Sequence, residues 1–188
     1  MATPAFAGEY QTTIDAFSYG NYIVPAYDGD PSEPVNGNLP AFSSEELNAA
    51  PYVYYGDLDA LGRCTTASSL LSSSLMPTWK RGSISSVKPT GWVQKQYDVV
   101  SGKNLYNRCH LIGWQLAGAD LTSLTKEELT KDLITGTRYL NVGTGGTGMV
   151  GYENEVAGYL KEDAENEVAY RVTTVFAEDK NRPEMGRT

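Results

Sequence analysis

The segment that decides the fold of this chain is NRCHLIG, residues 107–113. Its side chains alternate in polarity with those just before it, which is typical of a β-strand. We therefore predict a strand over residues 103–112, with Tyr106, Arg108, His110 and Ile112 on one face and Leu105, Asn107, Cys109 and Leu111 on the other. His110 is the only histidine among the 188 residues. Any histidine chemistry in this protein therefore depends on this strand.

Arg108 and His110 share a face, and the pair suits hydrolysis of a phosphodiester. A guanidinium can hold a phosphate while an imidazole removes a proton from water. The alternative is a core histidine that hydrogen-bonds to backbone. Cys109 is adjacent to His110 and points to the opposite face, so the two cannot form a Cys–His dyad. This geometry disfavours a thiol hydrolase.

The charge of the chain is unevenly distributed. The net charge is −8 and the pI is about 4.7, which taken for the whole chain disfavours a polyanionic partner. Residues 80–108, however, hold six basic residues and one acidic residue, a net charge of +5, and they lead into His110. This segment is either a solvated basic face or a groove that faces phosphates. No run of about 20 apolar residues occurs, so we predict no membrane span.

The chain has the length of about one domain, and both helices and strands are expected in it. We expect an extended arm over residues 1–40, with a short strand near residues 22–24, and a single domain over residues 41–188. Helices are expected from Ser43 or Ser44 to before Pro51, and over residues 67–75, 123–129 and 152–160. Strands are expected over residues 52–55, 93–97, 103–112 and 168–176.

The N-terminus and the cysteines favour export. Ala5-Phe6-Ala7 before Gly8 has the small-x-small form of a signal-peptidase site, so we expect a secreted protein. The first residues are either the stub of a removed leader or simply the start of this chain. Cys64 and Cys109 are either free and buried or bridged, and a bridge would close a loop of about 46 residues.

The segment NRCHLIG resembles the Asp-Arg-Gly-His signature of the non-specific DNA/RNA endonucleases, in the variant of secreted bacterial DNA-entry and streptodornase-type nucleases. The resemblance covers roughly residues 40–177, in ordered blocks. These blocks are RGSI and VKPTGW (residues 81–84 and 87–92), LITGTRYLNV (133–142), YENEVA (152–157) and YRVT (170–173). Several blocks in order are far more specific than one four-residue motif.

The resemblance implies an α+β fold in which a mixed, mainly antiparallel sheet accompanies a ββα-metal (His-Me finger) nuclease core that holds one divalent cation. The cation would be Mg²⁺, with Mn²⁺ or another divalent cation possible, and the substrates would be DNA and RNA. Carried over, His110 is the general base, Asn141 is the direct metal ligand and Glu153 orients a metal-bound water. The candidate phosphate contacts are Arg108 and, more weakly, Arg81, Lys88, Arg138 and Arg171.

Several features of the sequence keep alternatives open. Asn107 stands where the family has aspartate, and the Gly143–Gly148 segment is longer than the usual link to the glutamate helix. Glu155 is a rival for the role of Glu153. The chain ends at Thr188, where the family normally continues with further strands, so we expect a truncated form.

The second interpretation is therefore a catalytically impaired module that keeps the nuclease fold and binds nucleic acid or another partner. Within it, Asn141 caps a turn, and Arg138 and Arg171 are ordinary salt-bridge partners. An inhibitor or immunity partner is left open by the sequence.

Overall fold

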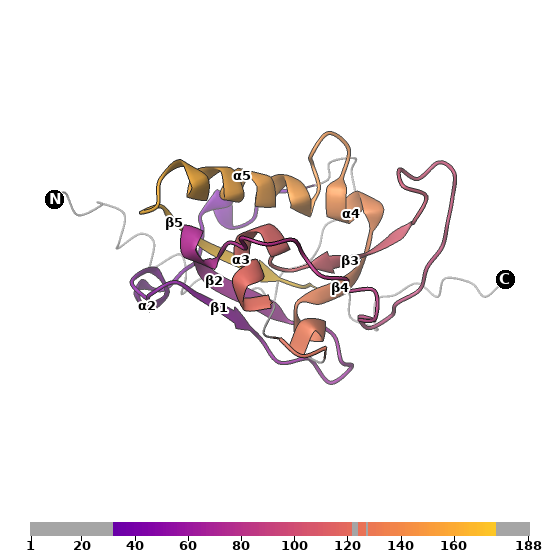
Figure 1. The fold of residues 1–188 in the computed structure, drawn as a ribbon, viewed down its shortest axis with the longest axis horizontal. Coiled ribbons are helices and arrows are strands. Elements are labelled where there is room, and N and C mark those ends of the chain that lie inside the picture. The colour runs from indigo at the N-terminus through magenta and orange to yellow at the C-terminus, as the bar shows by residue number, and fades with distance from the viewer. Residues whose placement is uncertain (1–31, 122–123, 127, 176–188) are drawn as a thin grey trace.

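The computed structural model describes residues 32–121, 124–126 and 128–175 (Figure 1). These residues form a mixed α+β structure with two antiparallel sheets, which confirms the predicted fold class. Most of the arm expected over residues 1–40, including the strand near residues 22–24 and the Ala5–Ala7 segment, lies outside the described residues. Within the described ranges, no helix is long and apolar enough to cross a membrane.

The larger sheet has three antiparallel strands in the order β1-β2-β5: Tyr52–Tyr55, Thr66–Ser72 and Glu167–Thr173. The expected strands at both edges are confirmed. The helix expected over residues 67–75 is wrong, because Thr66–Ser72 is the central strand and is followed by the short 3₁₀ helix η3, Ser73–Leu75. Nearly every residue of β2 is buried, so the strand lacks the alternation that would reveal it.

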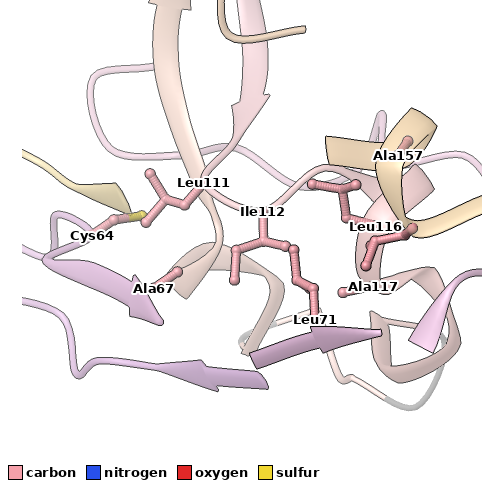
Figure 2. Packing of buried hydrophobic residues seen from close by; sticks show 9 residues of the cluster. Cys64, Ala67, Leu71, Leu111, Ile112, Leu116, Ala117 and Ala157 are labelled. Carbon is pink, nitrogen blue, oxygen red and sulfur yellow. The ribbon is translucent and has the colours of Figure 1, made fainter. Parts of the chain in front are cut away.

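The hydrophobic core lies between this sheet and two helices, α3 (Trp114–Leu121) and α5 (Met149–Glu162). Figure 1 shows α5 running along the sheet, and Figure 2 shows the buried cluster. The cluster consists of Cys64, Ala67, Leu71, Leu111, Ile112, Leu116, Ala117, Ala157 and Leu160. Ile112 therefore does not share a face with His110, because the strand has already ended. Trp114–Ala117 begins a helix rather than leading into a loop.

A second, two-stranded unit stands at one end of α5 (Figure 1). It pairs β3, Tyr106–His110, with β4, Leu133–Thr137, and the residue opposite His110 is Leu133. Helix α4, Arg138–Val142, follows β4 directly. The hydroxyl of Thr137 accepts a hydrogen bond from the backbone N–H of Leu140 at 3.0 Å and so starts this helix. Two strands and one helix are thus joined as a ββα unit.

The remaining elements are short. The expected helix after Ser43 is confirmed as α2, Ser44–Leu47, with Ser43 and Glu46 forming a capping box. Residues 93–97 form no strand and contribute one bridge, between Gln96 and Asn104. The helix expected over residues 123–129 lies partly outside the described residues, and a 3₁₀ helix, η4, covers Glu128–Lys131. Another 3₁₀ helix, η2, covers Asn36–Asn38.

Both cysteines are free and buried. The Cys64 thiol donates hydrogen bonds to the carbonyl oxygens of Thr130 and Leu133, at 2.9 and 3.0 Å. Burial raises the pKa of the Cys109 thiol to about 11, and its side chain packs against Gly136 of β4. A thiol with that pKa is a poor nucleophile at neutral pH, which agrees with the sequence argument against a thiol hydrolase.

Candidate functional site

A pocket of about 500 Å³ opens where β3 ends. Its wall contains His110 from β3, Asn141 from α4 and Glu153 from α5, so three residues that the sequence singled out lie on one pocket. We call it the His110 pocket. Its wall also contains Arg81, Arg108, Arg138, Trp92 and Trp114. Residues spread over more than 70 positions of the chain are thus gathered around the single histidine.

His110 is the last residue of β3, and only 9% of its surface is exposed. Burial, followed by the positive charge of Arg81, lowers the pKa of His110 to about 4. Both effects disfavour the imidazolium, so the ring is neutral at physiological pH. A neutral imidazole that borders a pocket is able to accept a proton from water.

Asp132 holds the backbone that follows His110. Its Oδ1 atom accepts hydrogen bonds from the backbone N–H groups of Leu111 and Ile112, at 3.1 and 3.0 Å. The side chain is fully buried, and burial raises the pKa of this carboxyl well above its usual range. Sequence reasoning missed this residue. Its one local signal is an acidic residue directly ahead of the apolar pair Leu133-Ile134.

Asn141 lies in the last turn of the five-residue helix α4. The helix ends at Gly143, whose φ of +61° lies in the left-handed region that glycine adopts without strain. The glycine-rich segment that follows turns back on itself, because the backbones of Gly143 and Gly148 approach too closely for a side chain on either residue. The long link therefore closes as a compact loop, and Asn141 and Glu153 still line the same pocket.

Glu153 is buried, with 7% of its surface exposed, although it lies on a helix. Its carboxyl packs directly over the Cα atom of Gly113, where any side chain would collide with it. Gly113 belongs to the NRCHLIG segment, so the strand end that supplies His110 also makes room for Glu153. Burial raises the pKa of the Glu153 carboxyl, and the neighbouring Gln115 partly offsets that effect. Glu155 is exposed on the same helix and does not line the pocket.

If Glu153 has the water-orienting role that the resemblance implies, Glu153→Gln should lower kcat/KM for nucleic acid by about 10- to 100-fold, the range for loss of a group that orients a metal ligand. Glu155→Gln is the matched control, because it makes the same chemical change two residues away on the exposed surface. It should keep wild-type activity. Equal losses of activity in both variants would contradict a specific role for Glu153 and would indicate a general effect of charge on the helix.

Arg108 lines the pocket, but much of its guanidinium is already engaged. Its Nε donates to the carbonyl oxygen of Val87 at 2.5 Å, and an Nη donates to that of Ser85 at 2.8 Å. The group also stacks on the ring of Trp92, 3.8 Å from its centroid. Arg108 thus ties the 85–92 loop to β3. A phosphate could reach only the N–H groups that remain.

The other predicted phosphate contacts divide into two pairs. Arg81 and Arg138 line the His110 pocket, whereas Lys88 and Arg171 do not. Lys88 is exposed outside it. The Arg171 guanidinium pairs with Glu46, donates to the carbonyl oxygen of Ala41 at 2.6 Å and stacks on Phe42. Arg171 therefore joins β5 to the segment around α2, as in the salt-bridge alternative.

Comparison with known proteins identifies the relatives of this fold and pocket. The family model of DNA/RNA non-specific endonucleases matches residues 43–188. The chain belongs to this family. Comparison with curated proteins gave no significant match. The residues matched by the family model include the ββα unit, α5 and the pocket residues His110, Asn141 and Glu153.

Solved structures share the fold of this endonuclease family member. NucA from Streptococcus agalactiae without metal superposes with a TM-score of 0.58 at 23% identity, covering 70% of this chain and 59% of NucA. The form of NucA with a magnesium ion gives 0.56 at 23%, with coverage of 68% and 57%. Sda1 nuclease with a bound zinc ion gives 0.54 at 22%, with coverage of 68% and 64%. An extracellular endonuclease gives 0.51 at 25%, with coverage of 73% and 61%.

The likeness to NucA and Sda1 is one of fold, given identities of 22–23%. The mixed α+β architecture with antiparallel sheets is that of the ββα-metal nucleases. This chain spans about three fifths of the length of these structures.

Proposed function

We propose that this endonuclease family member is a metal-dependent, sugar-non-specific enzyme that hydrolyses phosphodiester bonds in DNA and RNA. The observation that carries the proposal is the presence of His110, Asn141 and Glu153 on the wall of one pocket, together with Arg81 and Arg138. A neutral base, two oxygen donors and two guanidinium groups together can support phosphodiester hydrolysis.

The residues of the pocket fit a divalent cation such as Mg²⁺ or Mn²⁺. Burial raises the pKa of the Glu153 carboxyl, and a nearby cation would stabilise its charged form. Asn141 adds an amide oxygen, a hard donor of the kind that Mg²⁺ prefers. The described residues contain no group of three His, Cys, Asp or Glu side chains that could hold a metal. Asn141 would therefore be the direct ligand, Glu153 would orient a water, and most other positions would be waters and phosphate oxygens.

His110 performs the proton transfer in the proposed reaction. Its neutral imidazole accepts a proton from water as the water oxygen attacks phosphorus, and the bond to the departing 3′ oxygen breaks. A bound cation would supply positive charge that stabilises the pentacovalent phosphate and the departing oxygen. His110 is held at the end of β3 by the pairing with β4 and by the turn that Asp132 supports.

Arg138 and Arg81 hold the phosphate in this proposal. Arg138 lines the His110 pocket, and the N–H groups of its guanidinium are donors that suit phosphate oxygens. Arg81 places a second positive charge beside His110. Contacts to phosphate instead of to sugar or base would let one site cleave both DNA and RNA.

The pH dependence of kcat/KM should reflect the lowered pKa of His110. Because the ring is neutral above about pH 4, we expect activity to be nearly constant from pH 8 to pH 6 and to fall only at lower pH, as the ring gains a proton. Arg81→Ala removes one cause of the lowered pKa, so the fall should move to higher pH, whereas Arg81→Lys should keep it in place.

The pH at which kcat/KM falls to half its maximum is the quantity to compare between variants. Loss of a phosphate contact lowers the maximum itself, whether or not the pKa of His110 changes. Arg81 contributes to the lowered pKa of His110 but not to the raised pKa of Glu153. A change of the midpoint in Arg81→Ala would therefore assign the loss of activity at low pH to protonation of His110. A midpoint that is identical in Arg81→Ala and wild type would exclude this assignment.

Degradation of supercoiled plasmid DNA and of a structured RNA, each with Mg²⁺ or with EDTA, tests the proposed activity. We expect both substrates to be degraded with Mg²⁺ and neither to be degraded with EDTA. Binding of both without cleavage under all conditions would favour the second interpretation, a nuclease-fold module that has lost its activity. The well-formed pocket, with Asn141 and Glu153 on one wall in spite of the glycine loop, favours the active enzyme.

Binding of nucleic acid should weaken steeply with salt despite the acidic pI of the chain. Two arginine–phosphate contacts predict a slope of about −2 in a plot of log affinity against log salt concentration. Arg138→Ala should reduce that slope by about one. Lys88→Ala, an exposed cation outside the pocket, should leave it unchanged. A slope that is reduced in the Lys88 variant alone would indicate that the phosphate contacts lie outside the His110 pocket.

We infer an extracellular location for the enzyme. The small-x-small segment at residues 5–7 and the extracellular endonuclease among the similar structures support it. Detection of the mature protein in culture medium, but not in the cell fraction, tests this inference.

A further inference from the structure

A second hollow of about 230 Å³ adjoins the His110 pocket. The two share four residues in their walls, so they meet at the histidine: Arg81, Ile84, His110 and Trp114. The apolar side chains of the second hollow are those of Ile84, Leu124 and Leu129, in addition to Trp114. We call it the Trp114 hollow. An apolar compartment next to a polar catalytic pocket requires an explanation, because phosphate chemistry alone does not use it.

The tryptophan ring of this hollow is held firmly in place. Trp114 is the first residue of α3, and its ring lies against Gly118 one turn later. A Cβ atom on Gly118 would come within 2.8 Å of the ring and within 2.7 Å of Pro77. Trp79 packs edge-on against Trp114, with 6.5 Å between the ring centroids and 76° between the planes. The ring is thus supported from behind and from one edge, while it borders both hollows.

We propose that the Trp114 hollow receives one nucleobase of the nucleotide that flanks the scissile phosphate, stacked on the Trp114 ring. The inference rests on the proposed function, because it takes the scissile phosphate to lie between His110 and Arg81. A phosphate at that position has a nucleoside on each side, and one of them faces the apolar hollow. Every nucleobase has a π-face, so stacking on tryptophan adds affinity without choosing a sequence.

The size of the hollow supports a single base as its occupant. Its volume of about 230 Å³ lies below the 300–1,000 Å³ that is typical of pockets for drug-sized ligands, so one planar ring system fits better than a whole nucleotide. Arg81 at the shared wall would hold the phosphate that joins this base to the reacting centre. A base that is stacked and paired within a duplex cannot enter. The hollow therefore predicts a preference for single strands and for unpaired nucleotides.

The test uses short single-stranded oligonucleotides in which one linkage is a phosphodiester and all others are uncharged methylphosphonates. Two series carry an abasic residue on the 5′ or the 3′ side of the cleavable bond, and the third carries all its bases. We expect the wild-type chain to cleave the complete substrate about 10-fold faster than one of the two abasic series, given the usual size of base–aromatic stacking.

Variants of Trp114 should remove this discrimination. Trp114→Ala and Trp114→Leu should cleave complete and abasic substrates at equal rates, whereas Trp114→Phe retains a π-face and should keep most of the preference. Leucine keeps apolar contact near Gly118 and Pro77 but has no π-face, so it helps to separate loss of stacking from loss of folding, which circular dichroism checks in each variant. Tyr54→Ala, an exposed aromatic on β1 outside both hollows, is the control.

The outcomes distinguish failure of the base-stacking proposal from failure of the proposed function. Two results would contradict base stacking in the Trp114 hollow while leaving the proposed nuclease activity standing. One is cleavage of complete and abasic substrates at equal rates by wild type, and the other is discrimination that persists in Trp114→Leu. If the wild-type chain cleaves nothing, the proposed function fails. Binding of an oligonucleotide that contains 2-aminopurine then tests whether a base stacks in the Trp114 hollow. Quenching of its fluorescence by wild type but not by Trp114→Leu would support base stacking, and quenching that is equal in both would exclude it.

Discussion

Replacing His110 by alanine should lower kcat/KM for plasmid DNA and for RNA by about 10³-fold, in the middle of the range for loss of a general base. The ring is neutral at working pH because burial and Arg81 disfavour the imidazolium. It is also the only histidine in the chain, so no second imidazole can take over its role. The measurement is the initial rate of plasmid relaxation and RNA degradation at saturating Mg²⁺.

Cys109→Ala is the matched control for this variant, because it alters the adjacent residue of the same strand. Cys109 is buried on the opposite side of β3 and its thiol pKa is raised to about 11, so it takes no part in the chemistry. Its loss should cost some stability but leave kcat/KM within a few-fold of wild type. Full activity in His110→Ala, or a comparable loss in a folded Cys109→Ala, would rule out the imidazole as the base.

Affinity for nucleic acid provides a second readout of the His110 variant. In the proposed site Arg81 and Arg138 hold the phosphate, and the substitution does not remove them, so Kd for DNA measured with EDTA should change by no more than a few-fold. A large rise in Kd together with a lower thermal transition would indicate that His110 serves the fold instead of the reaction.

Some elements of the fold could be predicted from the sequence, and others could not. The alternation around His110 and the ordered blocks predicted β3, the ββα unit and α5, because each depends on a local period or on a family motif. The central strand β2 was mistaken for a helix. Its residues Thr66–Ser72 are small or apolar and are buried on both faces, so the period of two that marks a half-exposed strand is absent.

Contacts between distant segments set the limits of the site prediction. Arg171 was a candidate phosphate contact, but its partners Glu46 and Ala41 lie more than 120 residues earlier in the chain. Arg108 was expected to hold phosphate, and much of its guanidinium is instead bonded to the loop at Ser85 and Val87. No local pattern reveals which of several arginines will find an internal partner, since that depends on the tertiary fold.

Gly113 and Asp132 show what the sequence contained but did not reveal. Gly113 is part of the quoted motif, and its role is to leave space for a carboxyl from α5, forty residues later. Asp132 supports the turn after His110 through two backbone hydrogen bonds. Gly113 acts through close packing and Asp132 through hydrogen bonds, and both contacts form only when β3, β4 and α5 are assembled.

Removal of divalent cations should abolish cleavage, and Asn141→Ala should reproduce much of that loss at ordinary Mg²⁺ concentrations. Substitution of groups that merely orient a metal ligand costs about 10- to 100-fold, so loss of the direct ligand should lower kcat/KM by at least about 100-fold. In the proposed site Asn141 would bind the cation through its amide oxygen, whereas Glu153 would act through a water. The Asn141 variant should therefore need a higher Mg²⁺ concentration for half-maximal activity, and the Glu153 variant should show a smaller shift.

Titration of activity with Mg²⁺ after treatment with EDTA measures this dependence, and Asn48→Ala is the control for an asparagine outside the pocket. In Asn48→Ala the titration should coincide with that of wild type. Unchanged half-maximal Mg²⁺ in Asn141→Ala would mean that the cation binds elsewhere, and full activity of wild type in EDTA would mean that none is needed. Either result would contradict the assignment, whereas a shift confined to Asn141 and Glu153 would locate the cation between α4 and α5, where the glycine loop brings both residues to one wall.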